Sequence, residues 1–293
     1  MRLLLIHGRA QGNKDSVQLK DEWMSALRSG LTAAKLALPE KIHFDVPFYG
    51  KRLDQFVEQL GLEVDEVATA KGVGGDDEFA EFARQIALEA KDARGISDAM
   101  VRDNLIARHG QQASQKGPLD WEWVQSIISI LDYNLPGATE LVFSRFLRDV
   151  FLYTRRNVVR KQIDKIVAEN LTDEPTVVVG HSLGSVVGYN VLWSAGKSSI
   201  LAYVTLGSPL GIRGISSTLS TPLKNVGGRG GWYNAYDRRD VVALNPLDKK
   251  FFNVTPAISN RDDLVNTTNG HHGIVSYLDK LPVAQKIVAS FHQ

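Results

Sequence analysis

Five short apolar runs constrain most strongly the fold that this chain can adopt. They are short β-branched, aliphatic or aromatic runs that end in glycine or polar turn residues, and most are apolar without alternation; they cover residues 3–6, 42–46, 176–179, 201–206 and 232–236. Continuous apolar runs are typical of strands buried on both faces, as in a parallel sheet. Segments with helical periodicity lie between them. The sequence therefore predicts an α/β protein with a mostly parallel sheet flanked by helices.

The segments between the runs show the periodicity of amphipathic helices. Apolar residues recur every four positions at Trp23, Leu27 and Leu31, and a second stripe consists of Phe79, Phe82, Ile86 and Ala90. A third stripe lies in the helix expected over about 144–170 and consists of Leu147, Phe151, Val158, Ile163 and Ile166. We expect this last helix to be the crossover that leads into the run at 176–179.

The connection between the second and third runs is too long for one crossover helix. About 125 residues separate Phe48 from Thr176, whereas an ordinary crossover needs about 15–25. We therefore expect one domain over residues 1–293, with an insertion over about 54–143 that forms a mainly helical cap. Sites in open α/β sheets lie outside the carboxyl ends of the strands, and the insertion follows such an end, so the cap should cover the site.

Composition excludes several classes of protein. Lys plus Arg number 34 and Asp plus Glu 33, a net charge of +1, so the chain lacks the basic excess of a nucleic-acid-binding domain. No apolar run approaches the roughly 18 residues of a membrane span. The absence of cysteine excludes a disulfide scaffold, a thiolate metal site and a cysteine nucleophile. The apolar start of the chain ends at His7, too soon for a secretory signal, so we expect a cytoplasmic protein.

The stretch from Thr176 to Gly188 carries the most chemical information. It consists of an apolar strand, then Gly-His-Ser-Leu-Gly, then a helix-compatible run. G-x-S-x-G between a strand and a helix is the pattern of a nucleophile elbow, in which the serine lies on a sharp turn flanked by glycines. Ser182 is therefore the candidate nucleophile, and the N–H of Leu183, at the start of the helix, is a candidate oxyanion donor. A chance match to the pattern is the alternative.

A second oxyanion donor is expected from the loop after the first run. That run ends in His7-Gly8-Arg9, and a strand that ends in His-Gly is a usual source of such a backbone N–H. We assign this role to the N–H of Arg9. We interpret His7 as a buried histidine that is hydrogen-bonded to nearby backbone and shapes the loop, not as a general base.

These motifs together resemble the α/β-hydrolase superfamily, in particular its lipase and esterase branch with a GHSLG elbow. The resemblance covers the strands and their loops but not the insertion at about 54–143. It implies an α/β-hydrolase fold and a Ser-His-Asp triad in the chain order serine, acid, histidine. It also implies that no cofactor and no metal take part.

The implied order leaves few candidates for the other two triad members. Three histidines follow the serine, and His292 is the penultimate residue, so the candidates are His271 and His272. We prefer His272, because Gly-Ile and a helical start follow it, as in the family; a metal site at the pair lacks an acidic motif nearby. We prefer Asp240 over Asp237 as the acid, because it stands in an Asp-x-Val pattern after a strand.

Three further residues receive a role in forming the pocket. Ser208 lies in a Gly-Ser-Pro turn without a helix after it, so we interpret it as a wall of the pocket and not as a nucleophile. Trp123 and Ile127, four residues apart in the insertion, are our candidates for an apolar lining that binds an acyl group. The alternative is that both residues belong to the insertion's own core.

The function that follows is a serine hydrolase that cleaves carboxylic esters through an acyl-enzyme. The expected substrate is a small-molecule ester with an apolar acyl group. The same triad also serves thioesterases, amidases, peptidases and acyltransferases, so these remain alternatives. A non-catalytic binding protein with the same fold is a further alternative.

Overall fold

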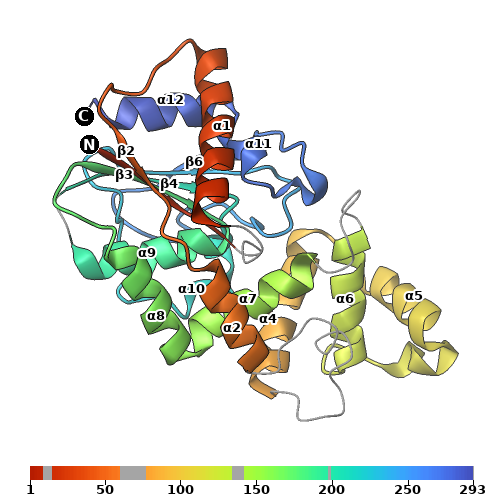
Figure 1. The fold of residues 1–293 in the computed structure, drawn as a ribbon. Helices are drawn as coiled ribbons and strands as arrows, with labels where there is room; N and C mark the ends of the chain where they lie inside the picture. The colour runs from red at the N-terminus through yellow and green to blue at the C-terminus, as the bar shows by residue number, and fades with distance from the viewer. Residues whose placement is uncertain (9–14, 60–76, 134–141, 197–198, 293) are drawn as a thin grey trace.

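A computed structural model describes residues 1–8, 15–59, 77–133, 142–196 and 199–292. Within these ranges, six strands form one parallel sheet with the order β2-β1-β3-β4-β5-β6 (Figure 1). The strands are β1 (Arg2–Ile6), β2 (His43–Asp45), β3 (Thr176–His181), β4 (Ile200–Leu206), β5 (Trp232–Ala235) and β6 (Ser259–Arg261). The α/β class, the parallel sheet and the five strands expected from apolar runs are thus confirmed.

The sixth strand, β6, was not expected from the sequence. Its three residues are polar and exposed, so it has no apolar run. It pairs with β5 at the edge of the sheet, and the Asn260 side chain accepts hydrogen bonds from Asn234 Nδ2 (3.0 Å) and from the Leu247 N–H (2.8 Å). Hydrogen bonds from neighbouring segments, not burial, hold this strand.

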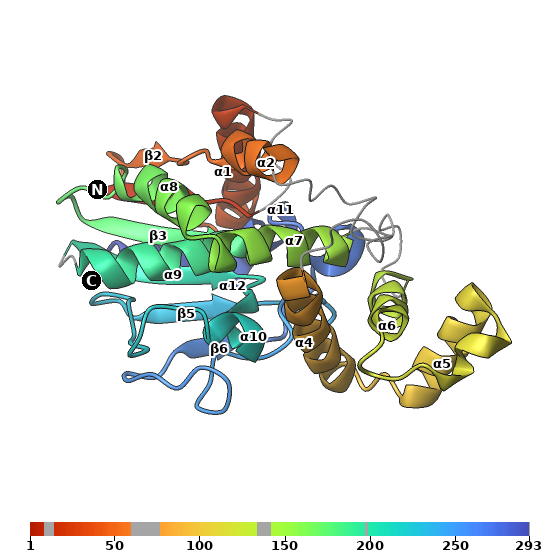
Figure 2. The ribbon, with the colours of Figure 1, turned by 90° about the horizontal axis from the view of Figure 1, so that it is seen from below.

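Helices cover both faces of the sheet (Figures 1 and 2). On one face lie α1 (Ser16–Ala34), α11 (Val275–Leu278) and α12 (Leu281–Ser290). On the other face lie α2 (Gly50–Gln59), α7 (Val142–Arg155), α8 (Asn157–Ala168), α9 (Leu183–Ala195) and α10 (Arg213–Ser216). Side chains along β1 alternate between the two faces of the sheet. Leu3 and Leu5 lie in the core on the face covered by α1, and Leu4 and Ile6 lie in the core on the face covered by α9. This alternation explains why the strand is apolar throughout.

Two of the expected helical stripes are confirmed. Trp23, Leu27 and Leu31 are buried along α1, which begins with a capping box formed by Asp15 and Gln18. The second stripe lies on α4 (Asp77–Ala93) and consists of the buried residues Phe79, Phe82, Ile86 and Ala90. In both helices the four-residue spacing places one apolar face against the core.

The prediction of a single helix over about 144–170 is wrong, because two helices, α7 and α8, occupy this segment. They are separated at Arg156, which has an extended backbone (φ −110°, ψ 98°). Its guanidinium pairs with Glu78 (2.7 Å) and lies over the ring of Phe151. The break shifts the apolar phase, so that Val158 is 64% exposed and Val159 is 1% exposed. Contacts with a distant segment hold this break.

Among the described residues, three α-helices lie wholly within the region expected to form the insertion: α4, α5 (Asp98–His109) and α6 (Trp121–Tyr133). In this region α5 packs on α6, α6 packs on α4, and α4 packs on α7 and α10. Figure 2 shows α5 farthest from the sheet. Residues 60–76 and 134–141 of the expected insertion lie outside the described residues.

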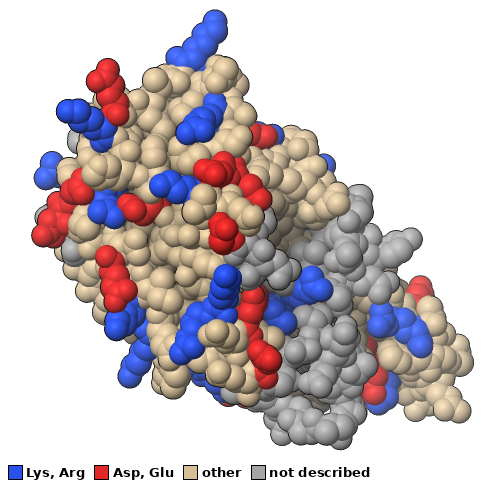
Figure 3. Space-filling model, viewed as in Figure 1, with Lys and Arg blue, Asp and Glu red and all other residues tan. Residues whose placement is uncertain are grey.

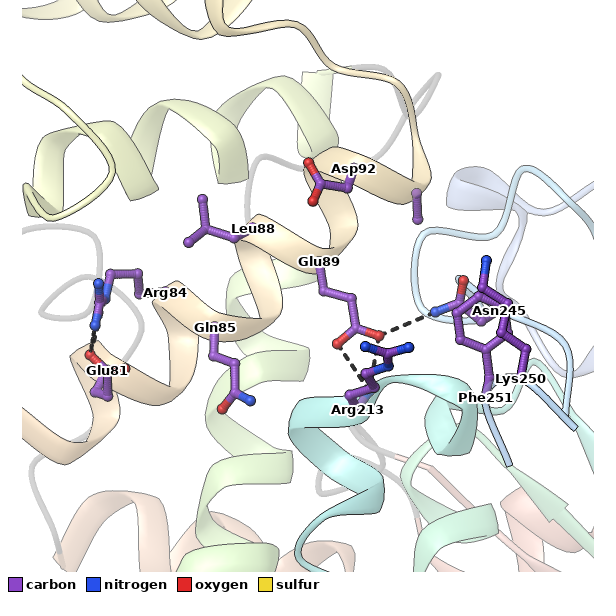
Figure 4. A pocket seen from close by; sticks show the side chains of 11 residues that line it. Glu81, Arg84, Gln85, Leu88, Glu89, Asp92, Arg213, Asn245, Lys250 and Phe251 are labelled. Carbon is purple, nitrogen blue, oxygen red and sulfur yellow. Dashed lines mark hydrogen bonds and ion pairs between the residues drawn. The ribbon is translucent and has the colours of Figure 1, made fainter. Parts of the chain in front are cut away.

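The α4 helix and the residue that follows it are attached to loops that follow β4 and β5. Both carboxylate oxygens of Glu89 accept a hydrogen bond from the Arg213 N–H (2.9 Å each), and one also accepts from Asn245 Nδ2 (3.3 Å; Figure 4). The guanidinium of Arg94 donates to the carbonyl oxygens of Arg238 and Asp240. These bonds join α4 and Arg94 to the carboxyl edge of the sheet.

Charged side chains of both signs are interspersed on the face of the molecule shown in Figure 3. This distribution agrees with the net charge of +1. Among the residues that the structure describes, none of the helices has both the length and the apolar character to cross a membrane.

Candidate active site

Ser182 lies on a sharp turn between β3 and α9. Its backbone has φ 54° and ψ −131°, a conformation that costs a non-glycine residue about 1–3 kcal/mol. The Ser182 N–H donates to the Leu206 carbonyl (3.2 Å), which fixes the turn against the end of β4. The hydroxyl Oγ is buried and has no hydrogen-bond partner among the described residues. A strained turn that presents an unpaired hydroxyl has the geometry expected of a nucleophile elbow.

Glycine is required where other backbone segments approach this turn. A Cβ on Gly184 would lie 2.2 Å from the carbonyl oxygen of Ile6, and a Cβ on Gly8 would lie 2.7 Å from Ser182 Cβ. The start of α9 therefore contacts the end of β1, and the loop after β1 reaches Ser182. Leu183 is the first residue of α9, so its N–H has no acceptor within the helix. Arg9, the other expected oxyanion donor, lies outside the described residues.

Two linked hydroxyl groups hold the turn at Ser182. Ser185 Oγ donates to the Ser182 carbonyl (2.6 Å) and is hydrogen-bonded to Ser208 Oγ (2.7 Å). Ser208 Oγ in turn accepts from the Leu210 N–H (3.3 Å). Ser208 is thus a buried residue that joins the loop after β4 to the first turn of α9.

Asp240 and His272 form a hydrogen-bonded pair. His272 Nδ1 lies 2.7 Å from Asp240 Oδ2. The other carboxylate oxygen, Oδ1, accepts from the N–H groups of Val242 (2.9 Å) and Ala243 (3.3 Å). Asp240 has no exposed surface, and four donors surround its carboxylate, the fourth being the O–H of Tyr277 to Oδ2 (2.7 Å). The pair therefore has a fixed geometry and a fixed imidazole orientation.

The environment of Asp240 favours its ionised form. Burial alone raises the pKa of this carboxyl, but the charge and hydrogen bond of His272 and the hydrogen bonds from Tyr277 and Val242 outweigh burial. The net result is a pKa below the ordinary value of an aspartate. Asp240 is thus a carboxylate that accepts the Nδ1–H of His272.

The alternative residues, Asp237 and His271, have other partners. The Asp237 carboxylate pairs with the guanidinium of Arg239 (2.6 Å) and accepts from the Asn266 N–H (2.8 Å). His271 Nδ1 lies 2.8 Å from the Asn266 carbonyl oxygen. The structure thus brings Asp240 and His272 together. Asp237 and His271 instead form hydrogen bonds with Arg239 and Asn266.

His181 connects the histidine loop to the turn at Ser182. Its Nε2 lies 2.7 Å from the His272 carbonyl oxygen, so this nitrogen carries the proton and donates. The two rings lie 4.7 Å apart between centroids. His272 Nε2 is buried without a hydrogen-bond partner among the described residues, as is Ser182 Oγ, so the structure contains no hydrogen bond between these two atoms.

Gly207 is a residue of the site to which the sequence gave only a place in the Gly-Ser-Pro turn. It has φ +54°, and a Cβ there would lie 2.9 Å from Asp240 Oδ2 and 3.1 Å from His272 Nδ1. The end of β4 thus lies directly against the Asp240–His272 pair. A glycine directly after a strand was the available signal; Tyr277 and Arg94 had none, because their partners are distant in sequence or belong to the backbone.

The structure confirms that His7 is buried and hydrogen-bonded to nearby backbone. The residue is fully buried, its Nδ1 lies 2.7 Å from the Gly8 carbonyl oxygen, and its Nε2 accepts from the Tyr49 N–H (3.1 Å). Burial lowers its pKa to about 4, and the hydrogen bond to Gly8 opposes this only in part. His7 is therefore neutral near pH 7 and fixes the loop that approaches Ser182.

Trp123 and Ile127 lie on α6 with 2% and 0% of their surface exposed. Both belong to the core that includes residues of α4, α5 and α6 and one face of the sheet. No contact of either residue with the site is established, so a role in lining an acyl pocket stays a prediction.

A pocket of about 620 Å³ lies between α4, Arg213 and the segment around Phe251 (Figure 4). Its lining combines acidic, basic and apolar side chains, and Glu89 within it bonds to the loops described above.

In the described part of the chain, no group of three or more metal-ligating side chains is arranged to hold a metal ion. Comparisons of the chain with protein-family models, curated proteins and solved structures return no match.

Proposed function

We propose that this protein is a serine hydrolase of the α/β-hydrolase type that cleaves carboxylic esters with an apolar acyl group. The observation that carries the proposal is the buried Asp240–His272 pair, whose loop is bonded through His181 to the turn that presents Ser182. The parallel sheet flanked by helices is compatible with this fold.

In the proposed reaction, His272 Nε2 accepts the hydroxyl proton as Ser182 Oγ attacks the ester carbonyl. Asp240 holds the Nδ1–H and stabilises the imidazolium. The N–H groups of Leu183 and Arg9 bind the oxyanion of the tetrahedral intermediate, each contributing about 3 kcal/mol. The alcohol leaves with the proton from His272, and a water molecule, activated by the same imidazole, hydrolyses the acyl-enzyme.

We further propose that residues of about 54–143 form a cap over Ser182. The bonds of Glu89 and Arg94 to the loops after β4 and β5 support this position. In this proposal Trp123 and Ile127 line the acyl side of the site. Single replacement of each by Ala should reduce the hydrolysis of long-chain esters more than that of short-chain esters. Equal loss on all esters with a lower melting temperature would assign both residues to the core.

A fluorophosphonate probe tests the proposed nucleophile, because it reacts covalently with activated serines. We expect the wild type to be labelled at Ser182 and to hydrolyse p-nitrophenyl esters. Ser182→Ala should abolish both, with a loss in kcat of several orders of magnitude. Ser208→Ala is the matched control, since this serine is also buried at the turn but bonded to Ser185. It should retain labelling at Ser182.

Two outcomes would contradict the proposal. Labelling that persists in Ser182→Ala would exclude this residue as the nucleophile. Absence of both labelling and ester hydrolysis in the folded wild type would favour a binding protein. A parallel panel of acyl-CoA thioesters and peptide amides assigns the substrate class, because higher kcat/KM on either would replace the ester in the proposal.

A further inference from the structure

The hydroxyl of Tyr277 makes three contacts within the candidate site. It donates to Asp240 Oδ2 (2.7 Å), accepts from the Asp237 N–H (3.1 Å) and lies 3.2 Å from the His271 carbonyl oxygen. Tyr277 belongs to α11, which begins three residues after His272. One phenol thus joins the loop that carries the candidate acid to the segment that carries the candidate base.

The direction of the Tyr277 proton follows from these distances. A phenol has one hydrogen to donate, and the Asp240 carboxylate is both nearer and more negative than the His271 carbonyl. The Asp237 N–H occupies a lone pair of the phenol oxygen and thereby orients the O–H. Burial, and then the charge of Asp240, raise the pKa of Tyr277 well above its ordinary value, so the group stays protonated.

Tyr277 and His272 donate to the same carboxylate oxygen, Asp240 Oδ2. Two donors on one oxygen share its negative charge, so the phenol weakens the hold of the carboxylate on an imidazolium proton. The phenol also fixes the position of this oxygen, because it is anchored to Asp237 and to α11. The contact therefore acts on both the geometry and the electrostatics of the pair.

We propose that Tyr277 is a positioning residue of the Ser182–His272–Asp240 system. Its O–H sets where Asp240 Oδ2 lies and limits how strongly the carboxylate retains the proton on His272. The inference rests on the proposed function, in which His272 must gain and release that proton in every cycle.

The test is Tyr277→Phe, which removes the hydroxyl and keeps the ring. With an undivided charge on Oδ2, the imidazolium is more stable, so the acid limb of the kcat/KM profile should move to higher pH by about 0.5 unit or more. The plateau of kcat should fall by about 3- to 10-fold with little change in KM, because Asp240 Oδ2 loses the contact that fixes its position while the substrate contacts are unchanged. A lower melting temperature with an unmoved limb would overturn the proposal.

Tyr153→Phe is the matched control. Tyr153 is also fully buried, donates to a carboxylate oxygen of Asp164 (2.6 Å) and accepts from Asn190 Nδ2 (3.1 Å). Its loss should lower the melting temperature and leave the pH profile unchanged. An equal shift of the acid limb in both variants would mean that any buried phenol produces the effect, and this would also overturn the proposal.

One further measurement separates this inference from the proposed function, and a second variant covers a failure of Tyr277→Phe to fold. The NMR titration of the His272 ring, assigned by comparison with His272→Gln, requires no substrate; it should move upward in Tyr277→Phe even if esters are not hydrolysed. If Tyr277→Phe fails to fold, Tyr277→3-fluorotyrosine replaces it. This stronger donor should move the titration of the His272 ring downward. An unmoved titration in the folded variant would overturn the proposal.

Discussion

At the scale of single residues, the candidate site depends on positions where a side chain is absent as much as on those where one is present. Gly207 has a positive φ, and the Asp240–His272 pair occupies the space where its Cβ would lie. The pair thus depends on a glycine from a third segment, at the end of β4. The ends of two strands hold the other candidates: the Leu206 carbonyl at the end of β4 accepts from the Ser182 N–H, and the His181 ring at the end of β3 donates to the His272 carbonyl.

We predict that Gly207→Ala lowers kcat/KM by about 100-fold, because a methyl group within 3.1 Å of both Asp240 Oδ2 and His272 Nδ1 displaces the pair. Gly196→Ala is the matched control: its φ is +55°, but nothing lies within 4 Å of the added Cβ. The control should lose about 1 kcal/mol of stability and no activity. Equal activity in the two variants would show that the close contact at Gly207 is not important.

The neighbouring candidates allow a direct comparison of roles. Asp240→Asn should lower kcat by about 10³- to 10⁴-fold, because the amide no longer selects the imidazole tautomer. Asp237→Asn should cost less than about 10-fold, since that carboxylate pairs with Arg239. The loss in kcat should likewise be larger for His272→Ala than for His271→Ala. The kcat values of the four purified variants measure both rankings, and a reversed ranking would transfer the role to the neighbour.

At the scale of elements, the residue after α4 connects this helix to the loop that carries the candidate acid Asp240 (the acid loop). Arg94 donates to the carbonyl oxygens of Arg238 and Asp240, and burial lowers the pKa of its guanidinium. These carbonyls lie on the same loop as the N–H groups of Val242 and Ala243, which donate to the Asp240 carboxylate. The positions of α4 and of Asp240 are thus coupled through the side chain of Arg94.

We predict that Arg94→Met lowers kcat by about 10-fold and speeds hydrogen exchange at the Val242 and Ala243 amides, because the acid loop loses two charged donors. Arg84→Met on α4 is the control, since Arg84 pairs only with exposed Glu81 among its described contacts, and such a pair contributes about 0–1 kcal/mol. Unchanged exchange in Arg94→Met would show that the loop holds itself.

At the scale of the whole molecule, buried histidines link stability to pH. Burial lowers the pKa of His7 to about 4; burial and then the charge of His272 lower that of His181 to about 3. Both rings are hydrogen-bonded in the neutral form. In the unfolded chain they have the ordinary value of 6.5, so the unfolded state binds more protons below that pH.

We therefore predict that the free energy of unfolding decreases as pH falls below about 6.5. At pH 5 the loss relative to pH 7.5 should approach about 2 kcal/mol for each histidine, which is a large part of a typical total of about 5–15 kcal/mol. Urea unfolding at the two pH values measures it. His181→Gln keeps an N–H donor and should remove about half of the dependence. An identical dependence in this variant would exclude His181 as a source.

The sequence by itself determined the features that have local signals. Five strands, the helical stripes of α1 and α4, and the turn at Ser182 follow from apolar periodicity and from glycine spacing, because burial and backbone sterics act within a few residues. The length of the connection between β2 and β3 likewise predicted additional helices. The sequence placed the candidate acids and the candidate histidines in two short loops, with two candidates in each.

Only the tertiary structure decided which of these candidates face each other. Asp240 meets His272 because β5 and α11 bring their loops together, and Asp237 meets Arg239 and Asn266 instead. The exposed strand β6 and the helix break at Arg156 also depend on partners far away in the chain. Hydrogen bonds and ion pairs between distant segments leave no periodicity in the sequence, so these features are fixed only when the chain is folded.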